Sequence, residues 1–392
     1  MGDPVVQHIA TIGGSLTRRA QAAERRARRR ERTVPLMPAP DTRTSLGNVV
    51  LISLEPWDDV WRRNQHLASR LPTLGLADHV TFVNPARWTD VAEYSPVPGV
   101  TVITPRRRIP KRLGGLRFVA TSLKLKVIRH CDTLWINDAT IGAWLSRHGS
   151  VVYDVTDDWR SAKSTPREVR RLIAAEDVLA IRARTIVCSE ELWRRWMSRY
   201  GIDASIVRNA VDRGAIDSAH PQDLGADSPH IGYVGTLHES RLDIDLVLRT
   251  AGSLAGGRVH LVGPDCLSDH ARSRLKSHPR ITLHGSVPAP EVPSWLVAFD
   301  VLICPHVITE FTLSLDAIKA YEYLATSRPV VATPTSGFQE LNAPGLYVSE
   351  DAFPDLVREA AAQNDSFRRD VPDWDDRAVQ FGAAIMRHNA DG

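Results

Sequence analysis

Short apolar runs alternate with stretches of helical periodicity from Asn48 to near the end of the chain. This alternation is typical of βαβ units and a parallel sheet, because each crossover helix covers a face of the strands that it joins. A polar, turn-rich segment at residues 220–229 divides the runs into two groups. The first group predicts strands at 49–54, 80–84, 100–104, 133–136, 151–154, 185–188 and 206–208. The second group predicts strands at 231–234, 259–262, 281–283, 301–304, 330–332 and 346–348.

The length of the chain is sufficient for two such sheets, each in its own domain. Its 392 residues are 43% hydrophobic and 24% charged, as in ordinary globular proteins. No apolar run approaches the ~20 residues that cross a bilayer, and no charged start with an apolar core opens the chain, so we expect a cytoplasmic protein. The expected organisation is an arm at 1–44, an α/β domain at 45–219, a linker at 220–229, a second α/β domain at 230–372 and a helical end at 373–392.

Two segments concentrate positive charge. Residues 1–44 hold nine arginines against four carboxylates, which gives +5; the whole chain is +3, so the remainder is 3 − 5 = −2. This arm lacks an apolar stripe, and it is either a solvated, flexible segment or one drawn to anionic lipid headgroups. Residues 106–112 are likewise either a solvated basic loop or a membrane contact. The arm has no aromatic side chain to stack on bases, and we expect no nucleic acid partner.

The stretch at residues 310–333 predicts a loop, a short helix and a buried strand. Ser314 is expected to cap the helix, with Asp316 in its first turn, where a carboxylate suits the positive end of the helix dipole. A free helix start offers unpaired N–H groups to a diphosphate, and Glu322 can accept hydrogen bonds from a ribose diol. The alternative is a surface helix on which Lys319 and Glu322 pair in solvent.

Acidic residues follow two predicted strands of the first domain. Asp157 and Asp158 come soon after the strand at 151–154, and Asp138 follows the strand at 133–136. A carboxylate at the carboxyl end of a strand can take the proton from an acceptor hydroxyl or position that hydroxyl. Helix capping by Asp157 or Asp158 is the alternative.

In the second domain, Gly235 follows the first predicted strand, and Arg241 lies in the same loop. A glycine there lets the backbone approach a phosphate closely, and the arginine can neutralise the phosphate charge. Because any turn between a strand and a helix can require a glycine, this signal depends on the stretch at 310–333 for support.

The segments at 316–325 and 329–332 resemble GT-B glycosyltransferases of group 1, in family four, and especially a bacterial cell-surface polysaccharide branch. The resemblance implies two Rossmann-like, parallel-sheet domains facing a cleft, with a C-terminal helix that crosses back to the first domain. It also implies that Glu322 binds the ribose of the donor, while residues just before it face the sugar and diphosphate. Many members have a second glutamate eight positions earlier, and this chain has Ser314 there.

The same resemblance implies roles for other residues of the second domain. Backbone near Val287 would hold the nucleotide base, and His306 would lie near the sugar or phosphate. Lys319, Arg241 and the helix start would stabilise the departing diphosphate, so we expect neither a metal nor any other cofactor. Asp316 and Lys319 match the variant pattern of the polysaccharide branch.

The sequence therefore predicts a glycosyltransferase that moves a sugar, expected to be a hexose, from a nucleoside-diphosphate donor to a hydroxyl acceptor in cell-surface polysaccharide or glycolipid synthesis. The acceptor is either lipid-linked or soluble. Family four implies retention of anomeric configuration, but Ser314 leaves inversion open, with Asp157 or Asp158 as the base. The alternatives are a GT-B nucleotide-sugar epimerase and a non-catalytic protein that binds nucleotide sugars.

Overall fold

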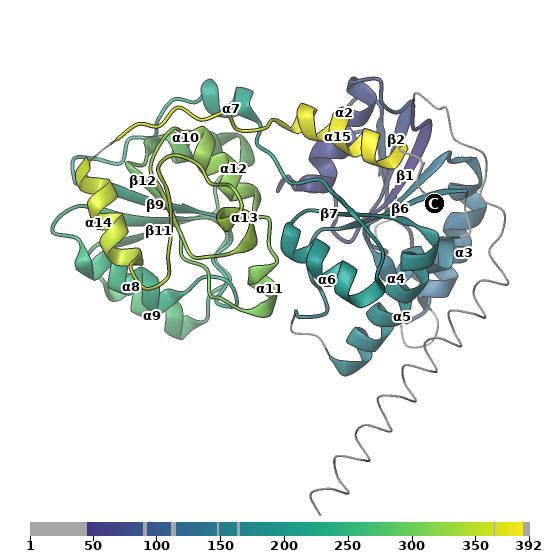
Figure 1. The fold of residues 1–392 in the computed structure, drawn as a ribbon, viewed down its shortest axis with the longest axis horizontal. Helices are drawn as coiled ribbons and strands as arrows, with labels where there is room; N and C mark the ends of the chain where they lie inside the picture. Colours follow the sequence, from purple (N-terminus) through teal and green to yellow (C-terminus); the bar gives the residue numbers. More distant parts are fainter. Residues whose placement is uncertain are drawn as a thin grey trace, which may run out of the picture. The chain divides into compact units, whose positions relative to one another are not determined.

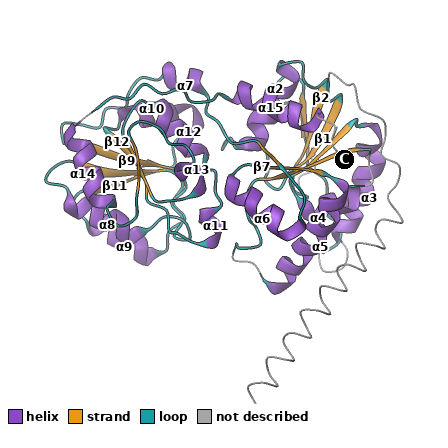
Figure 2. Ribbon diagram, viewed as in Figure 1, coloured by secondary structure: helices purple, strands orange, loops and turns teal. Residues whose placement is uncertain are grey.

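The computed structural model describes residues 45–88, 92–110, 115–146, 149–162, 165–363 and 365–386. The predicted basic arm at 1–44 and the end of the predicted basic loop, residues 111 and 112, lie outside the described residues. Within the described ranges the chain forms two sheets, each with helices on both of its faces (Figures 1 and 2). None of the helices in these ranges is both long enough and apolar enough to cross a membrane.

The first sheet of the described chain has eight strands, in the order β3-β4-β2-β1-β5-β6-β7-β8. All neighbouring strands are parallel except β3, which runs antiparallel to β4. The strands are β1 (Asn48–Ile52), β2 (His79–Val83), β3 (Glu93–Tyr94), β4 (Val100–Ile103), β5 (Thr133–Ile136), β6 (Ser150–Val155), β7 (Arg184–Val187) and β8 (Ser205–Ile206). The sequence did not predict β3, because its two residues are both exposed and no apolar run marks them.

The second sheet of the described chain has six strands, all parallel, in the order β11-β10-β9-β12-β13-β14. The strands are β9 (His230–Val234), β10 (Arg258–Val262), β11 (Ile281–Gly285), β12 (Val301–Cys304), β13 (Val330–Ala332) and β14 (Leu346–Val348). This order is the doubly wound order 3-2-1-4-5-6, and β4-β2-β1-β5-β6-β7 of the first sheet repeats it. The predicted pair of parallel α/β sheets is therefore confirmed.

Helices cover both faces of each sheet. On the first sheet they are α2 (Arg63–Thr73) and α15 (Trp374–Met386) on one face, and α3 (Gly115–Lys126), α4 (Ala139–Leu145), α5 (Pro166–Arg182) and α6 (Glu190–Tyr200) on the other. On the second sheet they are α8 (Ile244–Ser253), α9 (Asp269–Ser277) and α14 (Phe353–Gln363) on one face, and α7 (Arg213–Asp217), α10 (Val292–Ala298), α12 (Ile318–Ala325) and α13 (Ser336–Gln339) on the other. The remaining described turns of helix are η2 (Ile128–His130), η3 (Ala289–Glu291) and α11 (Glu310–Leu313).

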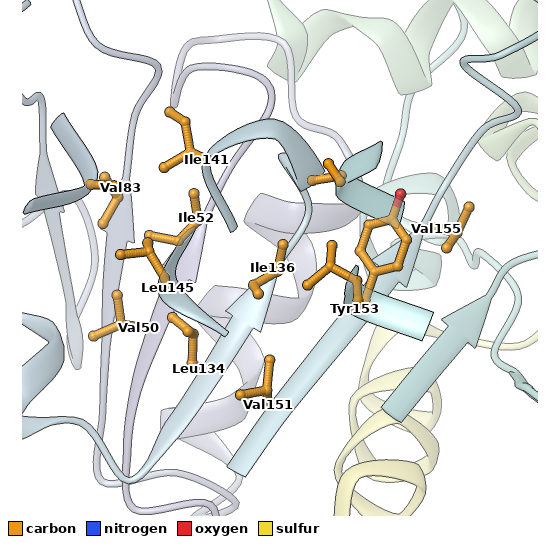
Figure 3. Close-up of a cluster of buried hydrophobic side chains, with 14 of the residues drawn as sticks. Val50, Ile52, Val83, Leu134, Ile136, Ile141, Leu145, Val151, Tyr153 and Val155 are labelled. Atoms are coloured by element: carbon orange, nitrogen blue, oxygen red, sulfur yellow. The ribbon is translucent and has the colours of Figure 1, made fainter. Parts of the chain in front are cut away.

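The side chains of β1 alternate between two hydrophobic cores, one on each face of the sheet. Val50 and Ile52 belong to the cluster under α3 to α6, whereas Val49 and Leu51 belong to the cluster under α2 and α15. Successive side chains of a strand point to opposite faces, so a run that is apolar throughout indicates a sheet covered on both sides. Figure 3 shows the first of these clusters, in which Ile136 lies among its neighbours on adjacent strands.

The last helix packs on the first sheet, as the sequence predicted. Phe381 of α15 lies 4.7 Å from the ring of Trp135 in β5, and both side chains are buried. At the start of α15, the ring of Trp374 stacks on His66 of α2 at 4.6 Å. Because both sheets belong to one compact unit of the chain, the domain boundaries at 219 and 230 stay predictions.

Candidate functional site

The strand order of the second sheet marks a candidate binding position. Strands β9 and β12 are neighbours, and the chain continues from β9 toward one edge of the sheet and from β12 toward the other edge. Ligands of such sheets bind outside the carboxyl ends of the two strands at this switch point. Gly235 directly follows β9, and His306 comes two residues after β12. The structure brings both residues to the same place as Lys319, in the first turn of α12.

Lys319 is held at this position by Tyr233. Its Nζ donates a hydrogen bond to the Tyr233 hydroxyl at 3.0 Å and lies 4.3 Å from the centre of that ring. Burial disfavours the charged ammonium, but the Tyr233 hydroxyl and Cys304 outweigh burial and raise the pKa of Lys319. A fixed, half-buried positive charge therefore lies at the carboxyl end of β9.

Gly235 leaves room for this charge. Its φ of 149° is rare for residues with a side chain, and a Cβ there would lie 2.5 Å from Nζ of Lys319. Its backbone also contacts the neighbouring loop, because a Cβ on Gly263 would lie 2.2 Å from the Gly235 carbonyl oxygen. Two crowded glycines thus bring backbone, rather than side chains, to the carboxyl ends of β9 and β10.

His306 is a buried, neutral imidazole beside the same charge. Its backbone N–H donates to the Thr333 hydroxyl at 2.9 Å, and its ring lies edge to face with Tyr233 at 6.4 Å. Burial, with the positive charges of Lys319 and Arg241, lowers the pKa of His306 well below its ordinary value. Its Nδ1 is buried without a hydrogen-bond partner among the described residues. This nitrogen is therefore available to a ligand group near the switch point.

Glu322 lies on α12 three residues beyond Lys319 and is half-buried. Burial raises the pKa of Glu322, and the charge of Lys319 opposes the shift. In the described part of the chain its carboxylate makes no hydrogen bond, so both oxygens are available as acceptors. A partly desolvated carboxylate of this kind suits a ligand that presents neighbouring hydroxyls.

The predicted start of this helix was wrong. Helix α12 begins at Ile318, and Ala317 occupies the capping position with no side-chain hydrogen bond. Ser314 instead ends α11, where its hydroxyl donates to the Phe311 carbonyl at 2.7 Å. Asp316 precedes α12 and is not in its first turn. The helix start is thus without a side-chain cap, which leaves its backbone N–H groups for a ligand or water.

Asp316 has a different set of partners. Its carboxylate accepts hydrogen bonds from the Asn209 backbone N–H at 2.6 Å and from the Tyr321 hydroxyl at 2.7 Å. Ser189, at the start of α6, donates to the Ser314 carbonyl at 2.8 Å. Asp316 and Ser314 therefore connect the stretch before α12 to residues that follow β7 and β8 of the first sheet.

On the first sheet, Asp157 is the carboxylate with the more unusual proton affinity. It follows β6, is half-buried and accepts a hydrogen bond from the Thr156 hydroxyl at 3.1 Å. Burial raises the pKa of Asp157 to about 6, although Arg241 and the Thr156 hydrogen bond oppose the shift. The charge of Glu55 adds to the increase. A carboxyl group with this pKa can exchange a proton near neutral pH.

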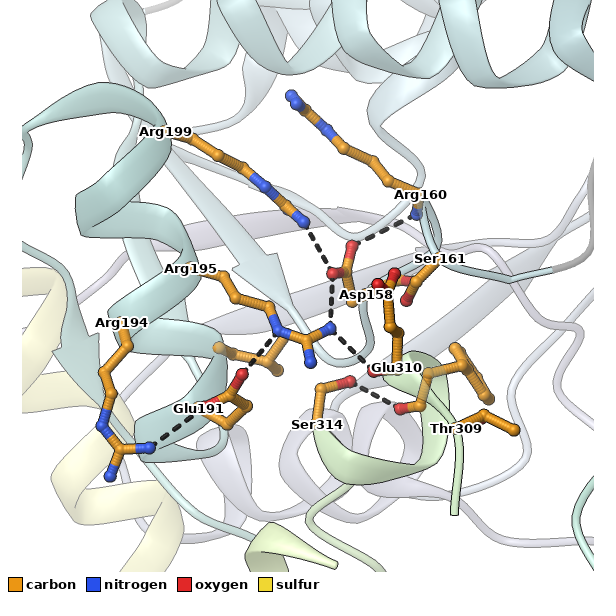
Figure 4. Close-up of polar contacts among 12 residues, drawn as sticks. Asp158, Arg160, Ser161, Glu191, Arg194, Arg195, Arg199, Thr309, Glu310 and Ser314 are labelled. Carbon is orange, nitrogen blue, oxygen red and sulfur yellow. Dashed lines mark hydrogen bonds and ion pairs between the residues drawn. The ribbon is translucent and has the colours of Figure 1, made fainter. Parts of the chain in front are cut away.

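Asp158, the neighbouring residue, is an ion-paired structural carboxylate. Its Oδ2 accepts from Arg195 at 2.8 Å and from Arg199 at 2.6 Å (Figure 4). Burial alone would raise its pKa, but the two arginines outweigh burial and lower the pKa of Asp158. Arg195 also donates to the Glu310 carbonyl at 2.7 Å, so this cluster reaches the first residue of α11. Of the two aspartates, the geometry favours Asp157 for proton transfer.

Asp138 is used locally. It caps α4, where its Oδ1 accepts from the Thr140 backbone N–H at 2.9 Å and from the Thr140 hydroxyl at 2.6 Å. Helix capping was considered for Asp157 and Asp158, but in the structure Asp138 is the aspartate that caps a helix. Asn137, which the sequence did not single out, is buried and accepts a hydrogen bond from Asn64 at 2.9 Å.

The structure adds Glu55, which sequence reasoning missed. It follows β1, is half-buried, and its Oε2 lies 3.0 Å from Nε of Arg62. Burial raises the pKa of Glu55, while Arg62 and Arg241 oppose the shift. The available signal was an acidic residue directly after the first apolar run, the same signal that drew attention to Asp157.

The last two predicted residues lie at the edges of the site. The guanidinium of Arg241 is exposed and stacks over the Phe311 ring at 5.3 Å. Its charge nevertheless acts on Glu55, Asp157 and His306. Val287 is half-buried after β11, where it packs on the core under α10 and α12. The described residues contain no group of three or more side chains suited to hold a metal ion.

Comparisons with known proteins agree with this architecture. Residues 228–363 match the family model described as "Glycosyl transferases group 1". The "putative teichuronic acid biosynthesis glycosyltransferase TuaH" of Bacillus subtilis is 23% identical over 213 residues, which are 50% of this chain and 53% of that protein. The match therefore spans about half the length of that curated relative.

Two solved structures show the fold. The sucrose-phosphate synthase of Thermosynechococcus elongatus has a TM-score of 0.66 at 16% identity, with 87% of this chain and 94% of that chain covered. HepE of Anabaena, in complex with UDP and glucose, has a TM-score of 0.58 at 16% identity, with 86% and 94% covered. Two doubly wound sheets with a returning C-terminal helix make up the GT-B fold. Within this class, the match over residues 228–363 confirms the resemblance to group 1 glycosyltransferases.

Proposed function

We propose that this protein is a glycosyltransferase that moves a sugar from a nucleoside-diphosphate donor to a hydroxyl acceptor. The observation that carries the proposal is the ammonium of Lys319, held by Tyr233 beside Gly235 and at the start of α12. A preorganised cation and an uncapped helix start stabilise negative charge that develops on a departing diphosphate. Glu322, one turn further along α12, would accept hydrogen bonds from the ribose hydroxyls of the donor.

Residues of both sheets have roles in the proposed reaction. Arg241 would add charge at the diphosphate, and the free Nδ1 of buried His306 would contact the phosphate or sugar. Backbone near Val287 would hold the nucleotide base. Asp157, with its pKa of about 6, would accept or position the proton of the acceptor hydroxyl. If the reaction inverts the anomeric centre, Asp157 is the base; if it retains the configuration, Asp157 orients the acceptor.

The names of the relatives indicate where to look for substrates. HepE is described in complex with UDP and glucose, which supports UDP-glucose as the first donor to test and a hexose as the transferred sugar. TuaH is described as a glycosyltransferase of teichuronic acid biosynthesis, which supports polysaccharide synthesis for the cell envelope. We propose a cytoplasmic enzyme that meets its acceptor at the inner face of the membrane. There the Arg-rich arm and residues 106–112 would contact anionic lipid.

The direct test is incubation of the purified protein with UDP-glucose, with and without a panel of saccharide and lipid-linked acceptors. Transfer of glucose supports the proposal, isomerised donor would indicate an epimerase, and binding without turnover would indicate a binding protein. Thermal shift with UDP, GDP and ADP should first identify the base, because a ligand of the folded state raises its melting temperature. If none of the three nucleotides binds, the proposed donor site is wrong. Turnover should also survive chelation of divalent metals, because Lys319 and Arg241 would neutralise the leaving group.

A further inference from the structure

A surface pocket of about 350 Å³ lies outside the site described above. Its lining comprises one aromatic residue, Trp88, and three consecutive arginines, Arg106, Arg107 and Arg108. Trp88 follows β2 and is 48% exposed, while the arginines follow β4, the neighbouring strand. The pocket therefore opens at the carboxyl ends of the first sheet, the same edge at which Glu55 and Asp157 lie.

Backbone pairing holds the pocket together. Beyond the ends of β2 and β4, Arg87 and Arg106 form an isolated parallel bridge, and the Arg107 backbone N–H donates to the Arg87 carbonyl at 2.6 Å. The Arg107 side chain donates to the Ala86 carbonyl at 3.2 Å and lies 5.6 Å from the centre of the Trp88 ring. These contacts fix one guanidinium against an aromatic wall. The pocket is thus a built feature of the strand ends.

Among the described residues, no acidic side chain compensates the positive charge of this pocket. The buried guanidinium of Arg63 pairs with the Asp154 carboxylate at 3.1 Å. Among the described residues, by contrast, no carboxylate pairs with any of the three pocket arginines. The sequence supports this imbalance, because residues 85–112 contain six cationic side chains and two acidic ones, a net of 6 − 2 = +4. Guanidinium groups that converge without a carboxylate are suited to bind an anion.

We propose that the pocket binds a phosphate group of the glycosyl acceptor, as a phosphate ester or a diphosphate. The proposal rests on the proposed function and adds the chemical class of the acceptor. Phosphate has several oxygens that can each accept from a different guanidinium, whereas a carboxylate has two. The exposed face of Trp88 provides an apolar wall for a sugar ring next to that phosphate.

The strand order also gives the approximate length of such an acceptor. Three steps between neighbouring strands separate β2 from β6, in the order β2-β1-β5-β6. At ~4.8 Å per step, the phosphate would lie roughly 15 Å from the hydroxyl that Asp157 serves. A glycan of more than one sugar unit therefore fits better than a single sugar phosphate.

The test is calorimetric titration of the full chain with inorganic pyrophosphate at physiological salt. The triple variant Arg106→Gln, Arg107→Gln, Arg108→Gln should lose affinity by at least about tenfold, since each arginine contributes a charge-assisted hydrogen bond. The matched control is Arg167→Gln, Arg170→Gln, Arg171→Gln on α5, three exposed arginines of the same domain without an ion pair among the described residues. The pyrophosphate affinity of this control variant should stay within about twofold of that of the unaltered protein. Melting temperatures of both triple variants verify that they fold.

A second variant separates this pocket from the donor site, which also binds diphosphate in the proposed function. Lys319→Ala should keep the pocket's pyrophosphate affinity. If Lys319→Ala loses pyrophosphate binding and the Arg106–Arg108 triple variant keeps it, the inference is overturned. Equal losses of pyrophosphate affinity in both triple variants would mean that binding depends on net charge and not on the pocket, which would also overturn the inference. UDP affinity, measured separately, should be unchanged by the Arg106–Arg108 substitutions. Failure of UDP to bind would count against the proposed function, while the pyrophosphate result would still decide the pocket.

Two further probes define the ligand. Glucuronate should bind at least about tenfold more weakly than pyrophosphate, and equal affinity would assign the pocket to carboxylates. At physiological salt, which screens the attraction of the basic segments to a lipid surface, phosphatidylglycerol vesicles should not displace pyrophosphate from the full chain. Displacement that the Arg106–Arg108 substitutions abolish would assign the pocket to a lipid headgroup and overturn the assignment to an acceptor.

Discussion

Nζ of Lys319 donates a hydrogen bond to the hydroxyl of Tyr233 at 3.0 Å and lies 4.3 Å from the centre of the same ring. The two residues belong to α12 and β9, so the contact ties the start of a helix to the strand at the switch point of the second sheet. Because Gly235 has no Cβ, the ammonium occupies space that any other residue would fill. The charge is therefore positioned before a ligand arrives.

This positioning predicts that Lys319→Ala lowers turnover more than donor binding. A charge that acts mainly on the departing diphosphate stabilises the transition state more than the bound substrate. We expect kcat to fall by about 10²-fold, as for other preorganised groups at a developing anion, and UDP affinity by less than about tenfold. Steady-state kinetics and calorimetry with UDP measure the two effects. Lys276→Ala, at an exposed lysine of α9, is the matched control. Equal losses in kcat and affinity would contradict the assigned role.

For Glu322, the expected defect is in binding. Glu322→Ala should weaken nucleotide binding by ~1.5–3 kcal/mol, the range for hydrogen bonds to a charged group, and the melting temperature without ligand should change little. Calorimetry with UDP measures this affinity. With a 2′-deoxy nucleotide, the difference in affinity between the variant and the parent should be smaller than with UDP. Glu359→Ala, on the exposed side of α14, removes the same charge elsewhere. Unchanged affinity in Glu322→Ala would remove this residue from the donor site.

The sequence was sufficient for the sheets but not for the start of α12. Apolar runs that are buried on both faces give a strong pattern, and β5, β12, β13 and β14 have the predicted bounds. Helix starts depend on single hydrogen bonds, and Ser314 is as good a cap in isolation as any serine. It does not cap α12, because the chain first ends α11 and then bonds Asp316 to Asn209. That partner is distant in the sequence, so no local pattern predicts it.

The same dependence on distant partners explains why the sequence did not distinguish the two aspartates after β6. Asp157 and Asp158 are adjacent and chemically identical, and local sequence gives no reason to separate them. Their environments separate them, because Arg195 and Arg199 of α6 reach Asp158, while Asp157 is half-buried near Glu55. Which carboxylate has an unusual pKa thus depends on contacts between elements, and only the structure supplies these.

For Asp157, we predict opposite effects on activity and stability. If its carboxylate accepts or orients the acceptor proton, activity should rise with pH through about 6, and Asp157→Asn should abolish that limb and lower kcat by about 10²- to 10⁴-fold. In the folded protein the pKa is about 6 instead of 3.8, so the folded state keeps this proton to higher pH than the unfolded state. The free energy of unfolding due to this group therefore falls as pH rises from 3.8 to 6.

Asp157→Asn should accordingly raise the free energy of unfolding at pH 7, by at most about 3 kcal/mol and by less where solvent screens the charge. Asp158→Asn is the contrasting variant. It leaves Arg195 and Arg199 without their buried partner and should destabilise by about 1–3 kcal/mol. Denaturant unfolding at pH 5 and pH 7 measures both. A pH profile that is identical in Asp157→Asn and the parent would exclude Asp157 from proton transfer.

His66 should make the protein sensitive to acid. Burial, with the charge of Arg70, lowers its pKa from 6.5 to about 3, so His66 stays neutral in the folded protein where the unfolded chain takes up a proton. The free energy of unfolding therefore falls as pH decreases below 6.5, by about 1–2 kcal/mol at pH 5. His66→Phe should keep the stack on Trp374 and remove this loss. His270→Phe, at an exposed position of α9, is the control. Equal acid sensitivity of both variants would refute the prediction.

The last prediction concerns contact with a membrane surface. The arm at residues 1–44 and the segment that begins at Arg106 are two basic regions, and stable attachment to a membrane generally requires two signals. Attraction to anionic lipid is screened over ~8 Å at physiological ionic strength, so vesicle binding should weaken sharply with added salt. Sedimentation with phosphatidylglycerol and phosphatidylcholine vesicles should compare the full chain, a chain that starts at Ser45, and the Arg106–Arg108 triple variant. At low ionic strength, we expect both altered proteins to sediment less with phosphatidylglycerol than the full chain does, with the truncated chain more affected because the arm alone carries +5. Equal recovery of the three proteins, or no preference for phosphatidylglycerol, would favour an acceptor that is reached in solution.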